Sequence, residues 1–198
     1  MTRIAVIFGA RGGIGSATRE AFLAAGYRVI PLNSSSINFS NPESDSKVQE
    51  ILKHSMADIV VNCVGHFDNK NIELHNKTFD INIGSSWSII RYYIENPPTA
   101  PVKIIMVGSS SYKSGRKSYI LYAASKAALY NVWQGACDYF NGSNVTLGLI
   151  NPVKTRTRIL DALPTDICLE PQDVAQEILS MASNNSNQLV DMKYPEEN

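Results

Sequence analysis

The chain has 198 residues, of which 44% are hydrophobic, and its 18 basic and 18 acidic side chains cancel to a formal net charge of zero. This length supports one domain with a sizeable core, residues 1–198, and is too short for two. The balanced charge and the lack of a Lys/Arg-rich stripe argue against a nucleic-acid partner. No apolar run reaches the roughly 18 residues of a spanning helix and the first is too short for a signal peptide, so we expect a cytoplasmic protein that contacts no membrane.

The cysteines and histidines form no recognisable ligand pattern. Cys63, Cys137 and Cys168 are odd in number, widely spaced and without a CxxC pair, and the three histidines are scattered. We therefore expect reduced thiols and no metal site.

The first predicted element is a strand, residues 4–8, that runs directly into a glycine-rich turn and a helix. Gly9 suits a tight turn, Gly13 lets backbone N–H groups approach a pyrophosphate, and Gly15 lets the helix pack closely on the strand. This strand, turn and helix context is the one that a dinucleotide-phosphate site requires, the alternative being a purely structural turn. The cofactor contacts expected here are Gly9, Arg11, Gly13, Ile14 and Gly15.

Further along the chain, apolar runs of strand length alternate with helical stretches, which indicates βαβ units. The other predicted strands are residues 28–32, 37–39, 57–64, 102–107, 145–150 and 188–192, and the predicted helices are residues 13–25, 43–55, 75–95, 119–140 and 171–183. We therefore predict an α/β fold, a Rossmann-type doubly wound parallel sheet with helices on both faces, and a loose tail over residues 194–198. Ligands of such folds bind beyond the carboxyl ends of the strands.

Tyr122 and Lys126 are four residues apart on a predicted helix and so project from the same face. A neighbouring ammonium favours the phenolate and lowers the tyrosine pKa from about 10 toward the range that suits proton transfer at neutral pH. The chain has nine tyrosines, so this spacing arises readily by chance and the surrounding motifs must decide.

Several motifs in order give the chain a resemblance to the short-chain dehydrogenase/reductase family over nearly its whole length. The run from Phe8 to Gly15 matches the family's Thr-Gly-x-x-x-Gly-x-Gly turn except at Phe8. Asn62-Cys63-Val64-Gly65 matches the family's Asn-Asn-Ala-Gly with two substitutions. The four catalytic identities stand at family spacing as Asn82, Ser109, Tyr122 and Lys126.

The resemblance implies hydride transfer between a nicotinamide and a carbonyl or alcohol. In the reductive direction Ser109 would hydrogen-bond the carbonyl oxygen while Tyr122 protonates it. Lys126 would hold the nicotinamide ribose and lower the pKa of Tyr122, and Asn82 would distort its helix and fix a water that links Lys126 to solvent. The alternative from another class is a nucleotide-binding sensor or scaffold without catalysis. A serine hydrolase is disfavoured because the residues around Ser109 lack the second glycine of a nucleophile elbow.

The end of the second strand bears on the choice of cofactor, because an acidic residue there would bind the ribose diol of NAD. This chain has Asn33 instead, and Ser34 and Arg11 can bind a 2′-phosphate, so NADP(H) is favoured over NAD(H). Asn38 matches the position where relatives usually have an aspartate that holds the adenine. The resemblance adds Asn62, Gly65, Tyr122 and Lys126 to the expected cofactor contacts.

The segment after residues 145–150 departs from the family, which has Pro-Gly followed by a threonine on the carboxamide. Pro152 is followed by Val153, and a gap-free match puts Thr157 on the nicotinamide whereas a gapped match puts Thr155 there. The Pro-Val pair and the short C-terminus look like the compact dihydropteridine-reductase branch, although that branch generally lacks the serine present as Ser109. A quinonoid dihydropteridine reductase therefore stays an alternative.

Two expectations concern partners. The helix at residues 119–140 has no charged side chain between Lys126 and Asp138, which favours burial on several sides and a homodimer or homotetramer, with a well-buried helix in a monomer as the alternative. Two loops beside the expected cleft hold six basic residues and no acidic one, and the basic residues are Lys113, Arg116, Lys117, Lys154, Arg156 and Arg158. They would attract an anionic carbonyl substrate, unless they are merely solvated or Arg156 serves the cofactor pyrophosphate.

Overall fold

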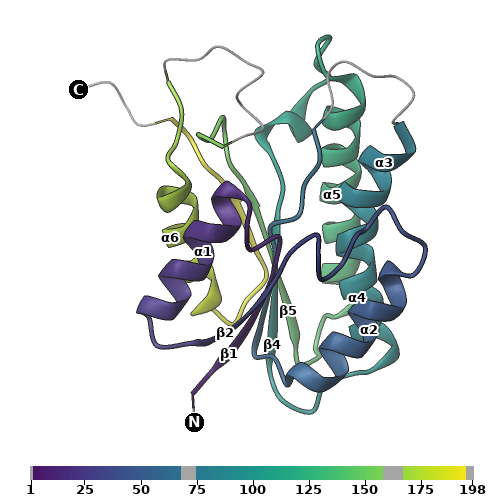
Figure 1. Ribbon diagram of the computed structural model, residues 1–198, viewed down its shortest axis with the longest axis vertical. Helices are drawn as coiled ribbons and strands as arrows, with labels where there is room; N and C mark the ends of the chain where they lie inside the picture. Colours follow the sequence, from purple (N-terminus) through teal and green to yellow (C-terminus); the bar gives the residue numbers. More distant parts are fainter. Residues whose placement is uncertain (1, 68–74, 158–166, 195–198) are drawn as a thin grey trace.

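A single parallel sheet organises the protein (Figure 1). The computed structural model describes residues 2–67, 75–157 and 167–194. Its six strands are β1 (Ile4–Phe8), β2 (Arg28–Leu32), β3 (Ile59–Asn62), β4 (Val102–Val107), β5 (Val145–Asn151) and β6 (Gln188–Asp191). They pair in parallel in the order β2-β1-β3-β4-β5-β6, so the order reverses between β1 and β3. A reversal of this kind opens a ligand-binding crevice at the carboxyl ends of the strands.

Helices cover both faces of the sheet, which confirms the predicted doubly wound fold (Figure 1). On one face α1 (Gly13–Ala24) packs against α6 (Pro171–Ala182), and on the other α2 (Ser44–Ser55), α4 (Ser85–Glu95) and α5 (Ile120–Tyr139) lie together. Within the described residues, no helix is long and apolar enough to cross a membrane, and no group of His, Cys, Asp or Glu could hold a metal ion.

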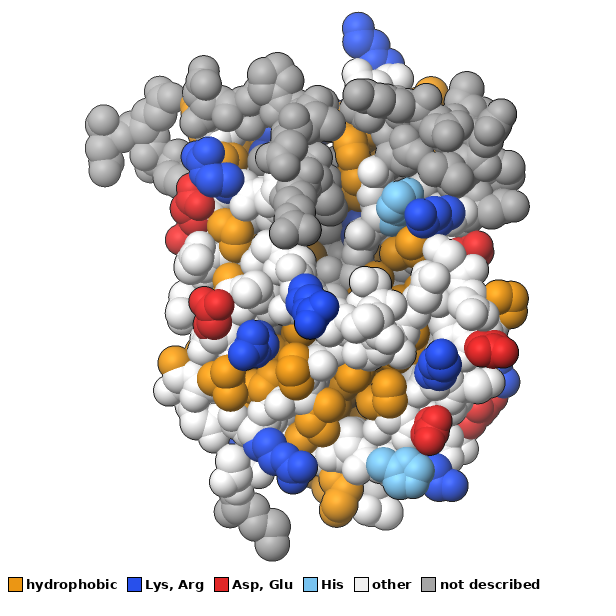
Figure 2. All heavy atoms as spheres, viewed as in Figure 1, with side chains coloured by type: hydrophobic (Ala, Val, Ile, Leu, Met, Phe, Trp, Pro, Cys, Tyr) orange, Lys and Arg blue, Asp and Glu red, His pale blue; other side chains and the backbone are white. Residues whose placement is uncertain are grey.

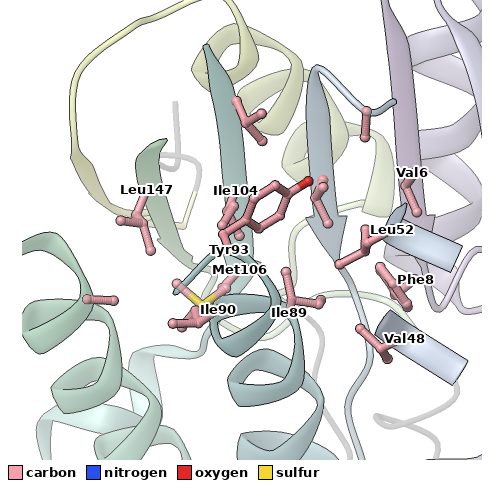
Figure 3. Packing of buried hydrophobic residues seen from close by; sticks show 14 of the residues in the cluster. Val6, Phe8, Val48, Leu52, Ile89, Ile90, Tyr93, Ile104, Met106 and Leu147 are labelled. Atoms are coloured by element: carbon pink, nitrogen blue, oxygen red, sulfur yellow. The ribbon is translucent and has the colours of Figure 1, made fainter. Parts of the chain in front are cut away.

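The four central strands, β1, β3, β4 and β5, are buried on both faces, which explains their continuous apolar runs. Successive residues of β1 alternate between two core clusters, with Val6 and Phe8 on the α2, α4 and α5 side and Ala5 and Ile7 on the other. Figure 3 shows the first cluster, in which strand side chains meet those of α2 and α4. Its labelled members are Val6, Phe8, Val48, Leu52, Ile89, Ile90, Tyr93, Ile104, Met106 and Leu147.

The predicted strand at residues 37–39 is wrong. The backbone N–H groups of Ser36 and Ile37 both donate to the carbonyl of Asn33, so the chain turns back instead of extending along an edge of the sheet. Ile37 and Phe39 are nevertheless buried, and the Phe39 ring lies 6.3 Å from that of Phe8. Their hydrophobicity reflects a loop that closes the core rather than a strand.

The helix predicted over residues 75–95 is interrupted. It consists of α3 (His75–Phe79), a π-helical turn at Asp80–Gly84, and α4. The wider turn contains Asn82, as expected from the predicted local distortion, and such turns often mark functional sites.

Charge on the described surface is mixed. Figure 2 shows basic and acidic side chains interspersed over the described part of one face, without a continuous basic stripe. This distribution on the visible face agrees with the zero net charge of the chain.

Candidate active site

A cleft with two adjoining lobes lies at the carboxyl ends of the central strands, where the strand order reverses. The larger lobe, of about 590 Å³, reaches from the glycine turn to Ser109 and Tyr122, and the smaller, of about 350 Å³, reaches from the same turn to the end of β2. The residues common to both lobes are Arg11, Gly12, Cys63, Val64 and Gly65. The cleft thus has the extended, two-part shape that a dinucleotide needs.

The glycine turn leaves no room for side chains. Gly9 has a φ of +78°, and a Cβ there would lie 2.9 Å from the carbonyl carbon of Cys63. A Cβ on Gly15 would overlap the carbonyl oxygen of Gly9, so α1 starts directly against the turn. The first N–H groups of a helix have no partner within the helix and therefore suit a phosphate. This turn fits the pyrophosphate of a nicotinamide dinucleotide.

The smaller lobe is lined at the end of β2 by Asn33, Ser34 and Asn38, and no acidic residue is among its described lining. The Oδ1 atom of Asn33 accepts hydrogen bonds from the N–H of Ser35 (2.9 Å) and its hydroxyl (2.6 Å). Asn38 Oδ1 accepts from the N–H of Ser40 at 3.1 Å. Both asparagine carbonyl oxygens thus shape this loop.

Ser109, Tyr122 and Lys126 line the larger lobe together. Ser109 follows β4, whereas Tyr122 and Lys126 lie one turn apart on α5. Burial is the largest influence on the pKa of Tyr122 and raises it, a hydrogen bond with Ser109 acts in the opposite direction, and the net shift is upward. The Ser109 hydroxyl and the Tyr122 phenol therefore lie near each other on the lining of the larger lobe.

Lys126 does not act on Tyr122 as expected from the sequence. Its Nζ donates to the carbonyl oxygen of Val107 at 3.0 Å and lies 5.7 Å from the centre of the Tyr122 ring. Burial also lowers the pKa of Lys126 to about 8. The ammonium is thus directed at a backbone oxygen, and the pKa of Tyr122 is raised rather than lowered.

Asn82 lies buried behind the cleft lining. Its Oδ1 accepts from the N–H of His66 at 2.7 Å, and its Nδ2 donates to the His66 carbonyl at 3.0 Å and to the Ser125 hydroxyl at 2.9 Å. A Cβ built on Gly65 would lie 3.9 Å from Asn82 Oδ1 and 4.0 Å from Lys126 Nζ, so the missing side chain leaves space beside both groups. This arrangement joins the segment that follows β3 to α5.

Asn62 is held by hydrogen bonds in the protein interior. It is buried, its Nδ2 donates to the hydroxyls of Ser85 and Ser86 at 2.9 Å each, and its Oδ1 accepts from the N–H of Val64 at 3.1 Å. The structure places it outside the lining of both lobes, whereas Gly65 lines both. Asn62 therefore shapes the cleft by tying β3 to α4.

The segment after β5 brings Pro152, Thr155 and Thr157 to the larger lobe. The Thr155 hydroxyl donates to the carbonyl of Val153 at 3.0 Å. The Cγ2 atom of Thr157 lies 2.7 Å from where a Cβ on Gly13 would be, so Thr157 faces the phosphate turn. Both threonines therefore border the cleft, from different positions.

Two of the six expected loop charges are paired with carboxylates from elsewhere in the chain. Lys113 Nζ lies 2.7 Å from Asp191, and Arg156 Nε lies 2.8 Å from Glu170. Sequence inspection of the two loops missed these partners because both are distant along the chain. Arg116 and Lys154 line the larger lobe, whereas Lys117 is exposed and, like Arg156, is outside the described lining. Arg158 lies outside the described residues. So do residues 195–198 of the predicted tail.

Aromatic residues around Tyr122 were not anticipated. The Phe67 ring lies 4.9 Å from that of Tyr122 and 5.3 Å from that of Tyr119, and Tyr194 also lines the larger lobe. Phe67 follows the Asn-Cys-Val-Gly motif closely, so its position was a usable signal. Nothing in the sequence indicates that Tyr194 returns to the cleft, because only the path of the chain after β6 brings it there.

Comparisons with known proteins agree with this geometry. Residues 5–153 match the NAD dependent epimerase/dehydratase family. The 3-oxoacyl-[acyl-carrier-protein] reductase FabG of Buchnera aphidicola subsp. Acyrthosiphon pisum (strain APS) is 23% identical over 222 aligned positions, which cover 92% of this chain and 91% of that protein. The bifunctional ribulose 5-phosphate reductase/CDP-ribitol pyrophosphorylase Bcs1 of Haemophilus influenzae is 29% identical over 94 residues, 45% of this chain and only 20% of that protein.

A short-chain dehydrogenase from Burkholderia cenocepacia J2315, solved with NADP, superposes with a TM-score of 0.84 at 18% identity, covering 97% of this chain and 88% of that one. At this identity the likeness concerns the fold. The chain belongs to the NAD dependent epimerase/dehydratase family. The resemblance to short-chain dehydrogenases/reductases is confirmed, and with it the class of nicotinamide-dependent oxidoreductases.

Proposed function

We propose that this protein is an NADP(H)-dependent reductase of small anionic carbonyl compounds. The observation that carries the proposal is the position of Ser109, Tyr122 and Lys126 on one wall of a cleft whose other lobe adjoins a glycine turn shaped for pyrophosphate. A sensor or scaffold would need the turn but would not need this group of proton-handling side chains. The arrangement therefore favours catalysis over binding alone.

In the proposed mechanism the substrate carbonyl lies against Ser109 and Tyr122. When bound, a nicotinamide dinucleotide supplies the hydride that reduces the carbonyl carbon. The Ser109 hydroxyl donates a hydrogen bond to the carbonyl oxygen and stabilises the charge that develops there. The Tyr122 phenol transfers its proton to the same oxygen, completing the alcohol. Because the pKa of Tyr122 is raised, the phenol holds its proton at neutral pH, as an acid for reduction must.

Lys126 and Asn82 support this step from behind Tyr122. The Lys126 ammonium, already directed to Val107, would bind the nicotinamide ribose hydroxyls and conduct the replacement proton toward the phenolate. Asn82 holds the backbone around His66 and, through Ser125, the turn of α5 that carries Tyr122. The space beside Gly65 gives the route for that proton from solvent.

A preference for NADP(H) is supported by the lining of the smaller lobe. Arg11 borders both lobes, Ser34 lies at the end of β2, and no acidic residue is among the described lining to repel a 2′-phosphate. We expect Arg11→Ala to weaken NADPH binding about tenfold and NADH binding less than twofold. Arg19→Ala, an exposed position further along α1, is the control. Equal losses for the two cofactors in the Arg11 variant would contradict the assignment.

The substrate class is proposed from charge and shape at the Tyr122 end of the cleft. Arg116 and Lys154 line this lobe, and its described lining contains no acidic residue. Phe67 and Tyr119 add aromatic rings beside Tyr122. A carbonyl compound with a carboxylate or phosphate fits such a site, in agreement with the Haemophilus influenzae relative that is named for ribulose 5-phosphate reduction.

The catalytic assignment is tested by following NADPH oxidation with 4-carboxybenzaldehyde as a probe. We expect Tyr122→Phe to lower kcat by at least about 100-fold while the NADPH dissociation constant changes by no more than a few-fold, because the hydroxyl acts in the transition state. Tyr27→Phe is the matched control, since Tyr27 is a partly exposed tyrosine outside the described lining of both lobes. Comparable turnover by the two variants would remove Tyr122 from the mechanism.

The anionic preference is tested by comparing 4-carboxybenzaldehyde with benzaldehyde. We expect the carboxylate to raise kcat/KM about tenfold at ~20 mM salt, and the advantage to shrink toward ~500 mM. Arg116→Ala should remove the advantage mainly through KM, whereas Lys117→Ala, in the same loop but outside the described lining, should retain it. A preference for the neutral aldehyde at low salt would refute this substrate class without affecting the catalytic assignment.

We also propose a homodimer or homotetramer formed through α4 and α5. Ile120 is 66% exposed, Tyr139 is 62% exposed, and Trp87 on α4 is 48% exposed, which are large apolar surfaces for a chain alone in water. Light scattering at micromolar concentration with NADPH should give a mass of at least two chains. A mass of one chain would assign these side chains to the surface of a monomer.

A further inference from the structure

The backbone at Ser109 is held by a buried side chain from the next strand. Asn151, at the end of β5, accepts a hydrogen bond from the N–H of Ser109 at 3.1 Å on its Oδ1. A Cβ on Gly108 would overlap that Oδ1 atom, so the approach depends on glycine at this position. Asn151 is 1% exposed and cannot exchange this partner for water without a rearrangement. The N–H of Ser110 is held in the same way by the carbonyl of Pro152, at 3.0 Å.

Asp191 joins this contact to the short helical turn that follows Ser109. Its Oδ1 accepts from Asn151 Nδ2 at 3.2 Å, and its Oδ2 accepts from the Tyr112 hydroxyl at 3.1 Å and from Lys113 Nζ at 2.7 Å. The turn, Ser110–Lys113, is capped by Ser109, whose Oγ accepts from the N–H of Ser111 at 3.2 Å. The contacts therefore form a closed ring that contains both the backbone and the hydroxyl of Ser109.

Tyr112 connects this ring to the helix that carries Tyr122. Its ring stacks on that of Tyr130 on α5, with centroids 4.7 Å apart and an interplanar angle of 23°. Tyr130 is one turn after Lys126, so a single side chain touches α5 through its ring and Asp191 through its hydroxyl. Displacement of Asp191 would therefore alter the position of Ser109 relative to Tyr122.

Asp191 is held in its charged form by the same contacts. Burial raises its pKa, but the hydrogen bonds from Lys113, Tyr112 and Asn151 outweigh burial and the net shift is downward. The carboxylate is thus ionised at neutral pH and accepts from all three donors at once.

We propose that Asp191 and Asn151 are positioning residues that hold Ser109 in place beside Tyr122. Neither Asp191 nor Asn151 is among the residues that line the larger lobe, so their effect on the site passes through Ser109. The expected effect of these two residues on turnover rests on the proposed reductase function. Their effect on the position of Ser109 beside Tyr122 does not. The positioning role can therefore be tested with and without activity.

The activity test compares Asp191→Asn with Glu170→Gln, which removes the other carboxylate that pairs with a basic loop residue. We expect Asp191→Asn to lower kcat with 4-carboxybenzaldehyde about tenfold and to leave the NADPH dissociation constant within twofold, whereas Glu170→Gln changes both by less than twofold. In a Ser109→Ala background, Asp191→Asn should lower kcat by less than twofold more, because the group that it positions is already absent. A further tenfold loss in that background would overturn the proposal.

A spectroscopic test needs no turnover. In protein with ¹³Cζ-labelled tyrosine, the Tyr122 resonance is assigned from its absence in Tyr122→Phe and titrated with pH. Because the hydrogen bond with Ser109 lowers the pKa of Tyr122, Ser109→Ala and Asp191→Asn should both raise that pKa, and Asn151→Ala should do the same. Glu170→Gln should leave the pKa of Tyr122 unchanged.

The two tests separate this proposal from the proposed function. An inactive wild-type protein whose Tyr122 titration responds to Asp191→Asn would refute the reductase and support the positioning role. An active protein with an unchanged Tyr122 titration and unchanged kcat in Asp191→Asn would refute the positioning role alone. Asp191→Glu keeps the carboxylate and should restore both readouts at least in part, which distinguishes positioning from general loss of folding.

Discussion

The pKa of Lys126 predicts a specific pH dependence for use of the cofactor. Burial lowers this pKa to about 8 in the protein before cofactor binds, and kcat/KM reports groups of the free protein. If only the ammonium form binds the ribose hydroxyls, kcat/KM for NADPH is constant below pH 8 and falls tenfold per pH unit above it. At pH 9.5 about 3% of Lys126 is protonated, so we expect roughly a 30-fold loss relative to pH 6.5.

The assay is initial-rate NADPH oxidation at subsaturating NADPH, from pH 6.5 to 9.5. Tyr122 does not obscure the result, because burial moves its pKa upward, away from this interval. Lys126→Met should give a low kcat/KM without the break near pH 8. Lys103→Met is the matched control, since burial also lowers the pKa of Lys103 to about 8 but Lys103 is outside the described lining of the cleft.

A profile that stays level to pH 9.5 would refute the role of the ammonium. So would a break near pH 8 that disappears in Lys103→Met and persists in Lys126→Met. A level profile would mean that Lys126 serves only to hold the carbonyl of Val107. The second result would mean that the break near pH 8 reports the titration of Lys103 and its effect on folding, not cofactor binding.

Three further predictions concern buried groups. Lys103 is 4% exposed, and burial lowers its pKa from 10.5 to about 8 on folding. Because the unfolded chain then binds more protons between these pH values, the free energy of unfolding in urea should be on the order of 3 kcal/mol larger at pH 10.5 than at pH 7.5. Lys103→Met should remove this increase. Gly15→Ala places a Cβ on the carbonyl of Gly9, so NADPH titration should show at least about a 100-fold weaker affinity, whereas Gly135→Ala, in open space on α5, should leave affinity unchanged. Asn62→Ala breaks three hydrogen bonds and should lower the free energy of unfolding by about 2–4 kcal/mol. The folded fraction should bind NADPH within a few-fold of wild type. A loss of NADPH binding without a loss of stability would make Asn62 a direct cofactor contact.

Local chemistry explains why much of the fold and site was predictable. The alternation of apolar runs and helical stretches identified the sheet, because buried parallel strands and amphipathic helices have different periodicities. Gly15 was recognisable because a Cβ there would meet the backbone of Gly9 in the same turn, whereas the close approach of Gly9 to the backbone of Cys63 arises only in the folded chain. The juxtaposition of Tyr122 and Lys126 was predictable because a spacing of four on a helix places two side chains together, but the spacing to Asn82 and Ser109 was needed to single this pair out.

Contacts between distant parts of the chain decided the rest. Residues 37–39 have the composition of a strand, but Ile37 and Phe39 pack into the core from a loop, where the Phe39 ring meets that of Phe8. Lys113 and Arg156 carry unpaired charge in the sequence and meet Asp191 and Glu170 only after folding. Tyr194 reaches the cleft because the end of β6 pairs with the end of β5, directly before the lining residue Pro152.

The pKa of Tyr122 shows the division most clearly. The sequence by itself determined that a lysine lies one turn away, which favours a lower pKa. The tertiary structure decided how deeply the phenol is buried and that the ammonium is directed at Val107, and burial prevails. Electrostatic effects depend on depth, orientation and distance in three dimensions, and none of these is local in the sequence.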